Sequence, residues 1–103
     1  MIDLDKKYID DIKKIISTYL KEYKIYIFGS RAKNSAKKYS DVDIALDSKE
    51  LNSEIKSKIE FTFENSIFPY KVDFIDLNDI SDDFKNLIKD DLVEIGRASC
   101  RER

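Results

Sequence analysis

The sequence predicts one small domain of the α/β or α+β class with a small mixed β-sheet. The chain has 103 residues, which is the size of a single domain with one core. Segments with an apolar repeat of three to four residues, typical of helices, are interspersed with short alternating or uniformly apolar segments, typical of strands. No internal repeat and no low-complexity linker divides the chain.

The N-terminal part of the sequence predicts a helix and then a buried strand. Apolar side chains recur every three or four residues from about residue 4 to 22, which gives a helix one apolar face. That face comprises Leu4, Tyr8, Ile12, Ile15, Ile16 and Tyr19. Residues 25–28 are β-branched or aromatic and stop at Gly29, so they predict a buried strand that ends in a turn. For residues 30–38, which are polar and lysine-rich, we expect a turn with one short helix.

A second strand is predicted at residues 41–46, where apolar and other side chains alternate. One face carries Val42, Ile44 and Leu46, and the other carries Asp41, Asp43 and Ala45. The first face is suited to packing in a core. The second face presents carboxylates that can take part in catalysis or metal binding.

The rest of the sequence predicts a helix, a strand, a short helix and a last strand. Apolar residues four apart indicate a helix over about residues 49–65, and Pro69 marks the break after it. Residues 70–77 predict a third strand and residues 92–95 a fourth. Ser81 is a candidate N-cap for the short helix. Its apolar residues, which we expect to face inward, are Ile80, Phe84, Leu87 and Ile88.

The composition excludes several classes of function. The sequence has no histidine and one cysteine, Cys100, which excludes an internal disulfide, His-based catalysis and nearly all zinc chemistry. Without an apolar run of about 18 residues or a basic N-terminus, we expect neither a membrane span nor a signal peptide, and hence a cytosolic protein. The net charge of −2 argues against binding bulk nucleic acid. Catalysis would therefore use carboxylates, hydroxyls, lysines and a cation held by oxygen.

Residues 96–103 differ in composition from residues 1–95, which we take as the domain. Three of the four arginines and the only cysteine lie in this tail, whereas the preceding residues use lysine almost exclusively. We expect the tail to be a cloning or read-through extension, with a disordered native terminus as the alternative.

Asp41 and Asp43 form the first part of a candidate site. Side chains two residues apart on a strand point the same way, with Cα atoms about 6.6–6.8 Å apart, so the carboxylates can converge on one or two cations. Mg²⁺ suits them because it takes one or two carboxylates together with phosphate oxygens. An EF-hand is excluded, because Ala45 and Leu46 stand where that loop needs an oxygen ligand and a glycine.

The turn at Gly29 and Ser30 forms the second part. It follows a predicted strand and opens a predicted helix, so its exposed N–H groups and the serine hydroxyl can bind an anion. Glycine allows the backbone to approach a phosphate closely. Arg31 and Lys33 can add positive charge beside it.

Asp73 forms the third part. Alternation places Val72 and Phe74 toward the core and Asp73 on the chemical face, where a carboxylate can accept a proton from an attacking hydroxyl. Asp76 points the opposite way and ranks second. Each part alone has an ordinary explanation, such as a solvated Asp-x-Asp, a simple turn or an aspartate paired with Lys71. The three parts in this order are specific.

Residues 27–32 and 40–46 together resemble the minimal nucleotidyltransferase (MNT) domain of the polymerase-β-like superfamily. The Gly-Ser turn, its spacing to Asp-x-Asp and the later Val-Asp-Phe-Ile-Asp strand all match, and the resemblance covers about residues 4–95. It implies an α+β fold, a small mixed sheet flanked by helices. One departure is Asn34, where the family often has glycine; asparagine tolerates a left-handed backbone better than most residues.

The resemblance also implies an activity, the transfer of AMP from ATP to an acceptor hydroxyl with Mg²⁺, or Mn²⁺, as cofactor. The implied nucleotide-binding residues are Gly29, Ser30, Arg31 and Ser40, and the implied catalytic metal ligands are Asp41, Asp43 and Asp73. Such domains commonly pair, as antitoxins, with an all-helical HEPN-type toxin encoded nearby and modify its tyrosine. The alternatives are a small-molecule acceptor or a catalytically weak module that only masks its partner. Homo- and hetero-oligomers are compatible with all three.

Overall fold

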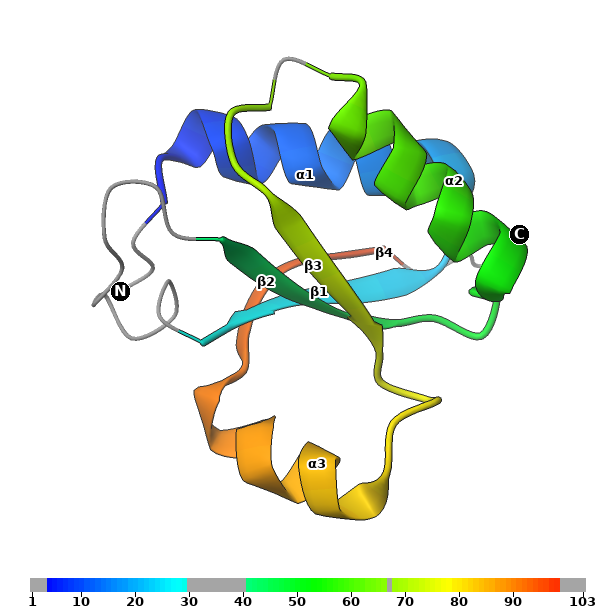
Figure 1. Cartoon of the computed structure of the whole chain (residues 1–103), viewed down its shortest axis with the longest axis vertical. Helices are drawn as coiled ribbons and strands as arrows, with labels where there is room; N and C mark the ends of the chain where they lie inside the picture. Colours follow the sequence, from blue (N-terminus) through cyan, green and yellow to red (C-terminus); the bar gives the residue numbers. More distant parts are fainter. Residues whose placement is uncertain (1–3, 30–40, 67, 99–103) are drawn as a thin grey trace.

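The protein, seen in a computed structural model, is a four-stranded sheet with helices on both faces (Figure 1). The structure describes residues 4–29, 41–66 and 68–98. The elements in chain order are α1 (Lys6–Tyr19), β1 (Tyr23–Phe28), β2 (Val42–Asp47), α2 (Ser53–Glu64), β3 (Val72–Asp76), α3 (Asp82–Ile88), the 3₁₀ turn η1 (Lys89–Asp91) and β4 (Val93–Ala98). The strand order is β3-β2-β1-β4. β2 pairs with β3 in parallel, and β1 pairs with β2 and β4 antiparallel, which confirms the predicted mixed sheet and α+β fold.

The larger core lies between the sheet and the pair α1 and α2, which cover one face (Figure 1). From β2 it includes the predicted apolar face, Val42, Ile44 and Leu46, each at most 1% exposed. Ile12 and Ile16 of α1 are fully buried against it. The phenol of Tyr19 and the hydroxyl of Thr62 lie 2.6 Å apart and join the two helices by a hydrogen bond.

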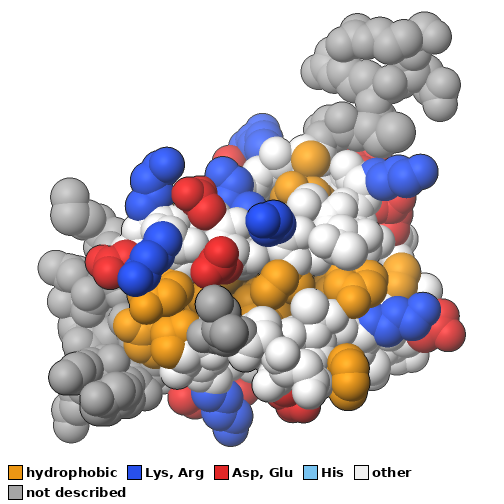
Figure 2. Space-filling view, turned by 90° about the horizontal axis from the view of Figure 1, so that it is seen from above, with side chains coloured by type: hydrophobic (Ala, Val, Ile, Leu, Met, Phe, Trp, Pro, Cys, Tyr) orange, Lys and Arg blue, Asp and Glu red, His pale blue; other side chains and the backbone are white. Residues whose placement is uncertain are grey.

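Seen from the side of these helices, apolar side chains run across the surface between charged ones (Figure 2). Phe61 of α2 is 65% exposed there and lines a shallow groove with Tyr19. The charged outer sides and the buried inner sides of α1 are the expected consequence of its helical apolar repeat. None of the helices in the described ranges is long and apolar enough to cross a membrane.

An aromatic cluster holds the segment that leads into β3. Phe68 meets Phe63 of α2 edge to face with ring centroids 5.4 Å apart, and it meets Tyr8 of α1 at 5.7 Å. Phe63 also contacts Phe74 of β3 at 5.3 Å. Aromatic pairs of this kind contribute about 0.5–1.5 kcal/mol beyond the area that they bury. They therefore fix where β3 begins relative to α2.

A smaller core lies on the opposite face of the sheet, beneath α3. Its buried residues are Ala45, Leu77 and Ile88, and Ile80 packs against them as predicted. The prediction that Phe84 and Leu87 face inward is wrong, because these side chains are 37% and 74% exposed. The apolar surface on this face is small, and Ile88, Ile80 and their neighbours already cover it. The Ser81 cap is confirmed, since its hydroxyl accepts a hydrogen bond from the Phe84 N–H.

Several element boundaries differ from the predicted ones. α1 ends at Tyr19 because Leu20 has an extended backbone, and α2 starts later, after the capping side chain of Asn52. β4 continues to Ala98, so the strand includes the first three residues of the predicted tail, residues 96–98. These residues pair along β1, whose outer edge would otherwise be open. Residues 99–103 lie outside the described residues, and the foreign origin of the segment stays a prediction.

We predict that Ile44→Ala lowers the free energy of unfolding by about 2–5 kcal/mol, because it opens a cavity under a central strand. Leu87→Ala is the matched control: its side chain is 74% exposed, and we expect a change within about 0.5 kcal/mol. Urea or thermal unfolding of the two variants measures both values. Comparable losses for the two substitutions would contradict this assignment of the core.

Candidate active site

Asp43 and Asp73 lie directly opposite each other on neighbouring strands. In the parallel pair of β2 and β3 the register places Asp43 beside Asp73. Neighbouring strands are about 4.8 Å apart and opposed side chains share a face, so the two carboxyl groups are adjacent. The predicted common face of the two aspartates is therefore confirmed. Asp43 is half-buried and Asp73 is exposed.

Gly29 completes this cluster from the other side of β2. Phe28, the last residue of β1, pairs with Asp43, and Gly29 follows it in a left-handed conformation with φ of 74°. A Cβ atom at Gly29 would lie 2.5 Å from Oδ2 of Asp43. The sequence predicted a glycine for close approach to a phosphate. The structure adds a second requirement, close approach of the backbone to the Asp43 carboxylate.

Asp43 is a half-buried carboxylate with two further carboxylates, Asp41 and Asp73, near it. Burial raises the pKa of the Asp43 carboxyl above its usual range, and the negative charges of Asp73 and Asp41 raise it further. Asp41 is exposed and lies directly before β2. Asp41 and Asp73 are thus both close enough to influence Asp43.

These residues fit a hard divalent cation. All the donors are carboxylate oxygens, and a cation between them would relieve the repulsion that raises the pKa of Asp43. In the described ranges, no three acidic side chains are close enough to form a complete metal cage by themselves. A cation here would need further oxygen ligands, which suits Mg²⁺, an ion that commonly keeps waters and binds substrate phosphates.

Other predicted site residues fall into two groups. Ser30, Arg31 and Ser40, like Asn34, lie in residues 30–40, outside the described residues, so their roles stay predictions. Asp76 serves the turn after β3, because its Oδ1 accepts a hydrogen bond from the Asn78 N–H at 2.9 Å. The sequence ranked Asp76 behind Asp73 as a candidate site residue, and this local role agrees with that ranking.

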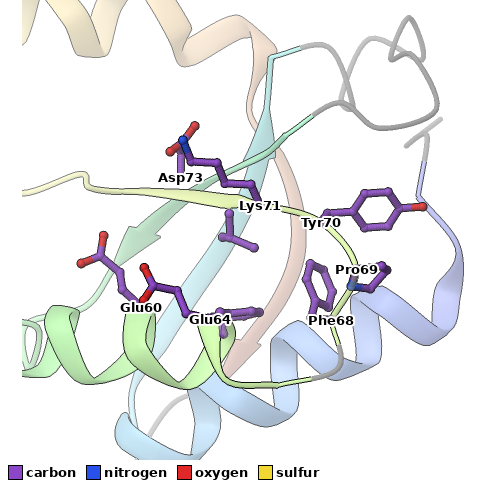
Figure 3. Close-up of a pocket in the computed structure, with 9 residues that line it drawn as sticks. Glu60, Glu64, Phe68, Pro69, Tyr70, Lys71 and Asp73 are labelled. Atoms are coloured by element: carbon purple, nitrogen blue, oxygen red, sulfur yellow. The ribbon is translucent and has the colours of Figure 1, made fainter.

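The sequence analysis missed a cavity of about 410 Å³ next to Asp73, between α2 and the start of β3 (Figure 3). Its residues include Glu60, Glu64, Phe68, Tyr70, Lys71 and Asp73. The available signal was two glutamates four residues apart on the polar side of α2. Spacing alone does not distinguish such a pair from an ordinary solvated helix face.

We predict that Asp43→Asn increases stability in metal-free solution. A raised pKa means that the native state binds the Asp43 proton more tightly than the unfolded chain does. The free energy of unfolding therefore falls as the pH rises from the usual value of 3.8 to the raised one, and the loss persists at neutral pH. Because asparagine cannot ionise, the variant should gain up to about 1 kcal/mol at pH 7, allowing for solvent screening at a half-buried group.

Unfolding of wild type and Asp43→Asn across pH 4–8 in about 1 mM chelator measures this gain. Asp76→Asn, on the opposite face of the sheet, is the control and should show no gain. Lower stability of Asp43→Asn at every pH would show that the carboxylate makes a net favourable contribution instead.

We predict that Gly29→Ala costs about 1–3 kcal/mol, because alanine disfavours a left-handed backbone and its Cβ would push against Asp43. The cost of the clash with Asp43 should disappear in an Asp43→Ala background. The cost of the left-handed backbone should remain. A double-mutant cycle on unfolding free energies should then give a coupling of at least about 0.5 kcal/mol. If the changes in unfolding free energy of the two single variants simply add in the double variant, the proposed contact is wrong.

Comparison with known proteins shows which family this chain resembles. The model of the nucleotidyltransferase domain family matches residues 9–99. The probable protein adenylyltransferase MntA of Haemophilus influenzae is 34% identical over 89 residues, which span 85% of this chain and 78% of the relative.

Two solved structures share the fold. A toxin–antitoxin complex with AMP-PNP has a TM-score of 0.74 at 22% identity, covering 87% of this chain and 73% of the matched chain. A tri-AMPylated HEPN toxin from Shewanella oneidensis in complex with an MNT antitoxin has a TM-score of 0.71 at 20% identity, covering 92% and 74%. Together with the carboxylates on β2 and β3 and the glycine turn after β1, the match over residues 9–99 shows that the chain belongs to the nucleotidyltransferase domain family.

Proposed function

We propose that the chain is a Mg²⁺-dependent enzyme that moves AMP from ATP to a tyrosine of an all-helical HEPN-type toxin and thereby acts as its antitoxin. The observation that carries this proposal is the position of Asp43, between Asp73 on β3 and the turn at Gly29 after β1. The named relative is a probable protein adenylyltransferase, and one protein of the same fold was crystallised with an AMPylated toxin. ATP as substrate makes the cytoplasm the expected compartment.

In this proposal the nucleotide lies over the carboxylates, with its phosphates at the turn of Gly29 and Ser30. Arg31 and Ser40 add contacts to the nucleotide. Asp41, Asp43 and Asp73 hold the Mg²⁺, which neutralises the phosphate oxygens and their carboxylate neighbours when it is bound. Gly29 has a left-handed backbone and carries no side chain that would block a phosphate.

The transfer is a single displacement at the α-phosphorus. The acceptor oxygen forms a bond to that phosphorus, and the bond from phosphorus to the oxygen that bridges to the β-phosphate breaks. Pyrophosphate leaves with the electron pair, and the proton of the acceptor hydroxyl passes to the Asp73 carboxylate. A tyrosine suits this step, because its phenol has a pKa of about 10 and gives up its proton more readily than an aliphatic hydroxyl.

Asp73 suits the role of the base better than Asp43. It is exposed at the outermost strand, where an acceptor from another molecule can reach it, whereas Asp43 is half-buried between two strands. Burial also raises the pKa of Asp43, and a bound cation would favour its charged form. Asp43 is therefore better suited to binding the metal.

We predict that the purified chain, with ATP and Mg²⁺, adds one or more AMP units to the HEPN-type protein encoded beside its gene. Asp43→Asn and Asp73→Asn should each lower the rate by at least about 100-fold, because they remove a metal ligand and the base. Asp76→Asn is the control on the same strand and should transfer AMP at the wild-type rate. Intact mass of the partner over time gives these rates.

Two other outcomes would replace the proposal. AMP transfer to a small molecule with an unmodified protein partner would indicate a small-molecule nucleotidyltransferase. Tight binding of the partner without any consumption of ATP would indicate a module that only masks the toxin.

A further inference from the structure

The cavity beside Asp73 opens along the free edge of the sheet. In the sheet formed by the described residues, β3 is the outermost strand and pairs with β2 alone. The Lys71 carbonyl accepts a hydrogen bond from the Val42 N–H, and the Leu77 N–H donates one to the Leu46 carbonyl. Because the backbone groups of alternate residues point to opposite sides of a strand, those of Val72 and Phe74 point outward. The cavity of about 410 Å³ lies at the beginning of this strand, between it and α2.

Two glutamates of α2 form the far wall of the cavity. Glu60 and Glu64 are four residues apart, and their carboxyl groups rise from α2 into the space between the helix and β3 (Figure 3). Within the described residues, neither carboxylate has a salt-bridge partner. The lining carries three carboxylates, from Glu60, Glu64 and Asp73, against one ammonium group, from Lys71, so three negative charges minus one positive charge leave −2.

The floor of the cavity is aromatic and held in place. Phe68 and Tyr70 lie 5.8 Å apart, centroid to centroid, and Tyr8 of α1 packs on both rings. Phe63 fixes the other side of Phe68. Such a floor can pack against the stem of a long side chain while the glutamates hold its charged end.

The cavity and the nucleotide turn lie on opposite sides of the aspartates. Across the sheet, Gly29 follows β1, Asp43 is on β2 and Asp73 is on β3, and the cavity is lined by Asp73, the start of β3 and α2. A nucleotide bound at the Gly29 turn would thus meet Asp73 from one side. A molecule in the cavity would reach Asp73 from the side of α2 and the start of β3, away from that turn.

From this arrangement we infer that the cavity binds a segment of the protein acceptor in which a lysine or arginine lies close to the acceptor hydroxyl. The basic side chain lies over the aromatic floor and pairs with Glu60 and Glu64, which places the hydroxyl at Asp73. This inference rests on the proposed function, and it makes Glu60 and Glu64 positioning residues that select the acceptor.

The test compares Glu60→Gln/Glu64→Gln with the control Asp10→Asn/Glu54→Gln, which removes two negative charges at exposed positions outside the cavity. AMP transfer to the neighbouring HEPN-type protein is followed at varied concentrations of that protein and of ATP. The cavity variant should raise the KM for the acceptor protein about tenfold, as expected for two charged contacts at a partly solvated site, and leave the KM for ATP unchanged. The difference should shrink at about 0.5 M salt.

A charge reversal, Glu64→Lys, should weaken use of the acceptor further than Glu64→Gln does. Thermal unfolding should be alike for all these variants, because neither glutamate belongs to the buried core. Equal KM values for the cavity variant and the control, with normal transfer by the wild type, would overturn the inference and leave the proposed function standing. No AMP on the protein with the wild-type enzyme would overturn both.

Discussion

The central position of β2 constrains the whole molecule. This strand pairs with β1 on one side and β3 on the other, and its side chains alternate between the larger core and the carboxylate face. A slip of one residue would expose Ile44 and bury Asp43, which the packing of α1 and α2 forbids. The apolar face of β2 therefore sets the register that places Asp43 beside Asp73 and under the Gly29 turn.

The arrangement has an energetic cost in the absence of a cation. The pKa of Asp43 is raised by its burial and further by the negative charges of Asp73 and Asp41. The burial of nearly inaccessible aliphatic side chains on the opposite face of the same strand offsets this cost, at about 1.5–3 kcal/mol for each side chain. Hydrophobic packing thus holds the site together against its own electrostatics, which agrees with the cation-binding role proposed above.

Local periodicity was sufficient to predict most of the elements and both faces of β2, because alternation at Val42, Asp43 and Ile44 leaves little choice. It did not reveal that β3 runs parallel to β2 or that Asp73 stands opposite Asp43, because strand order and register depend on contacts far apart in the sequence. The contact between Gly29 and Asp43 was hidden for the same reason. Periodicity also led to a wrong prediction in α3, where Leu87 is exposed. An apolar repeat indicates a helix but does not tell how much apolar surface the rest of the protein offers for it to pack against.

The free edge of β3 bears on how the molecule behaves at high concentration. An outermost strand with outward-pointing backbone groups can pair with the same strand of another copy, so that two sheets join edge to edge. Lys71 beside this edge and the glutamates Glu60 and Glu64 of α2 put charge where such a neighbour would have to lie. Like charges on two approaching copies would repel, so these side chains also protect the protein against uncontrolled self-association through its sheet.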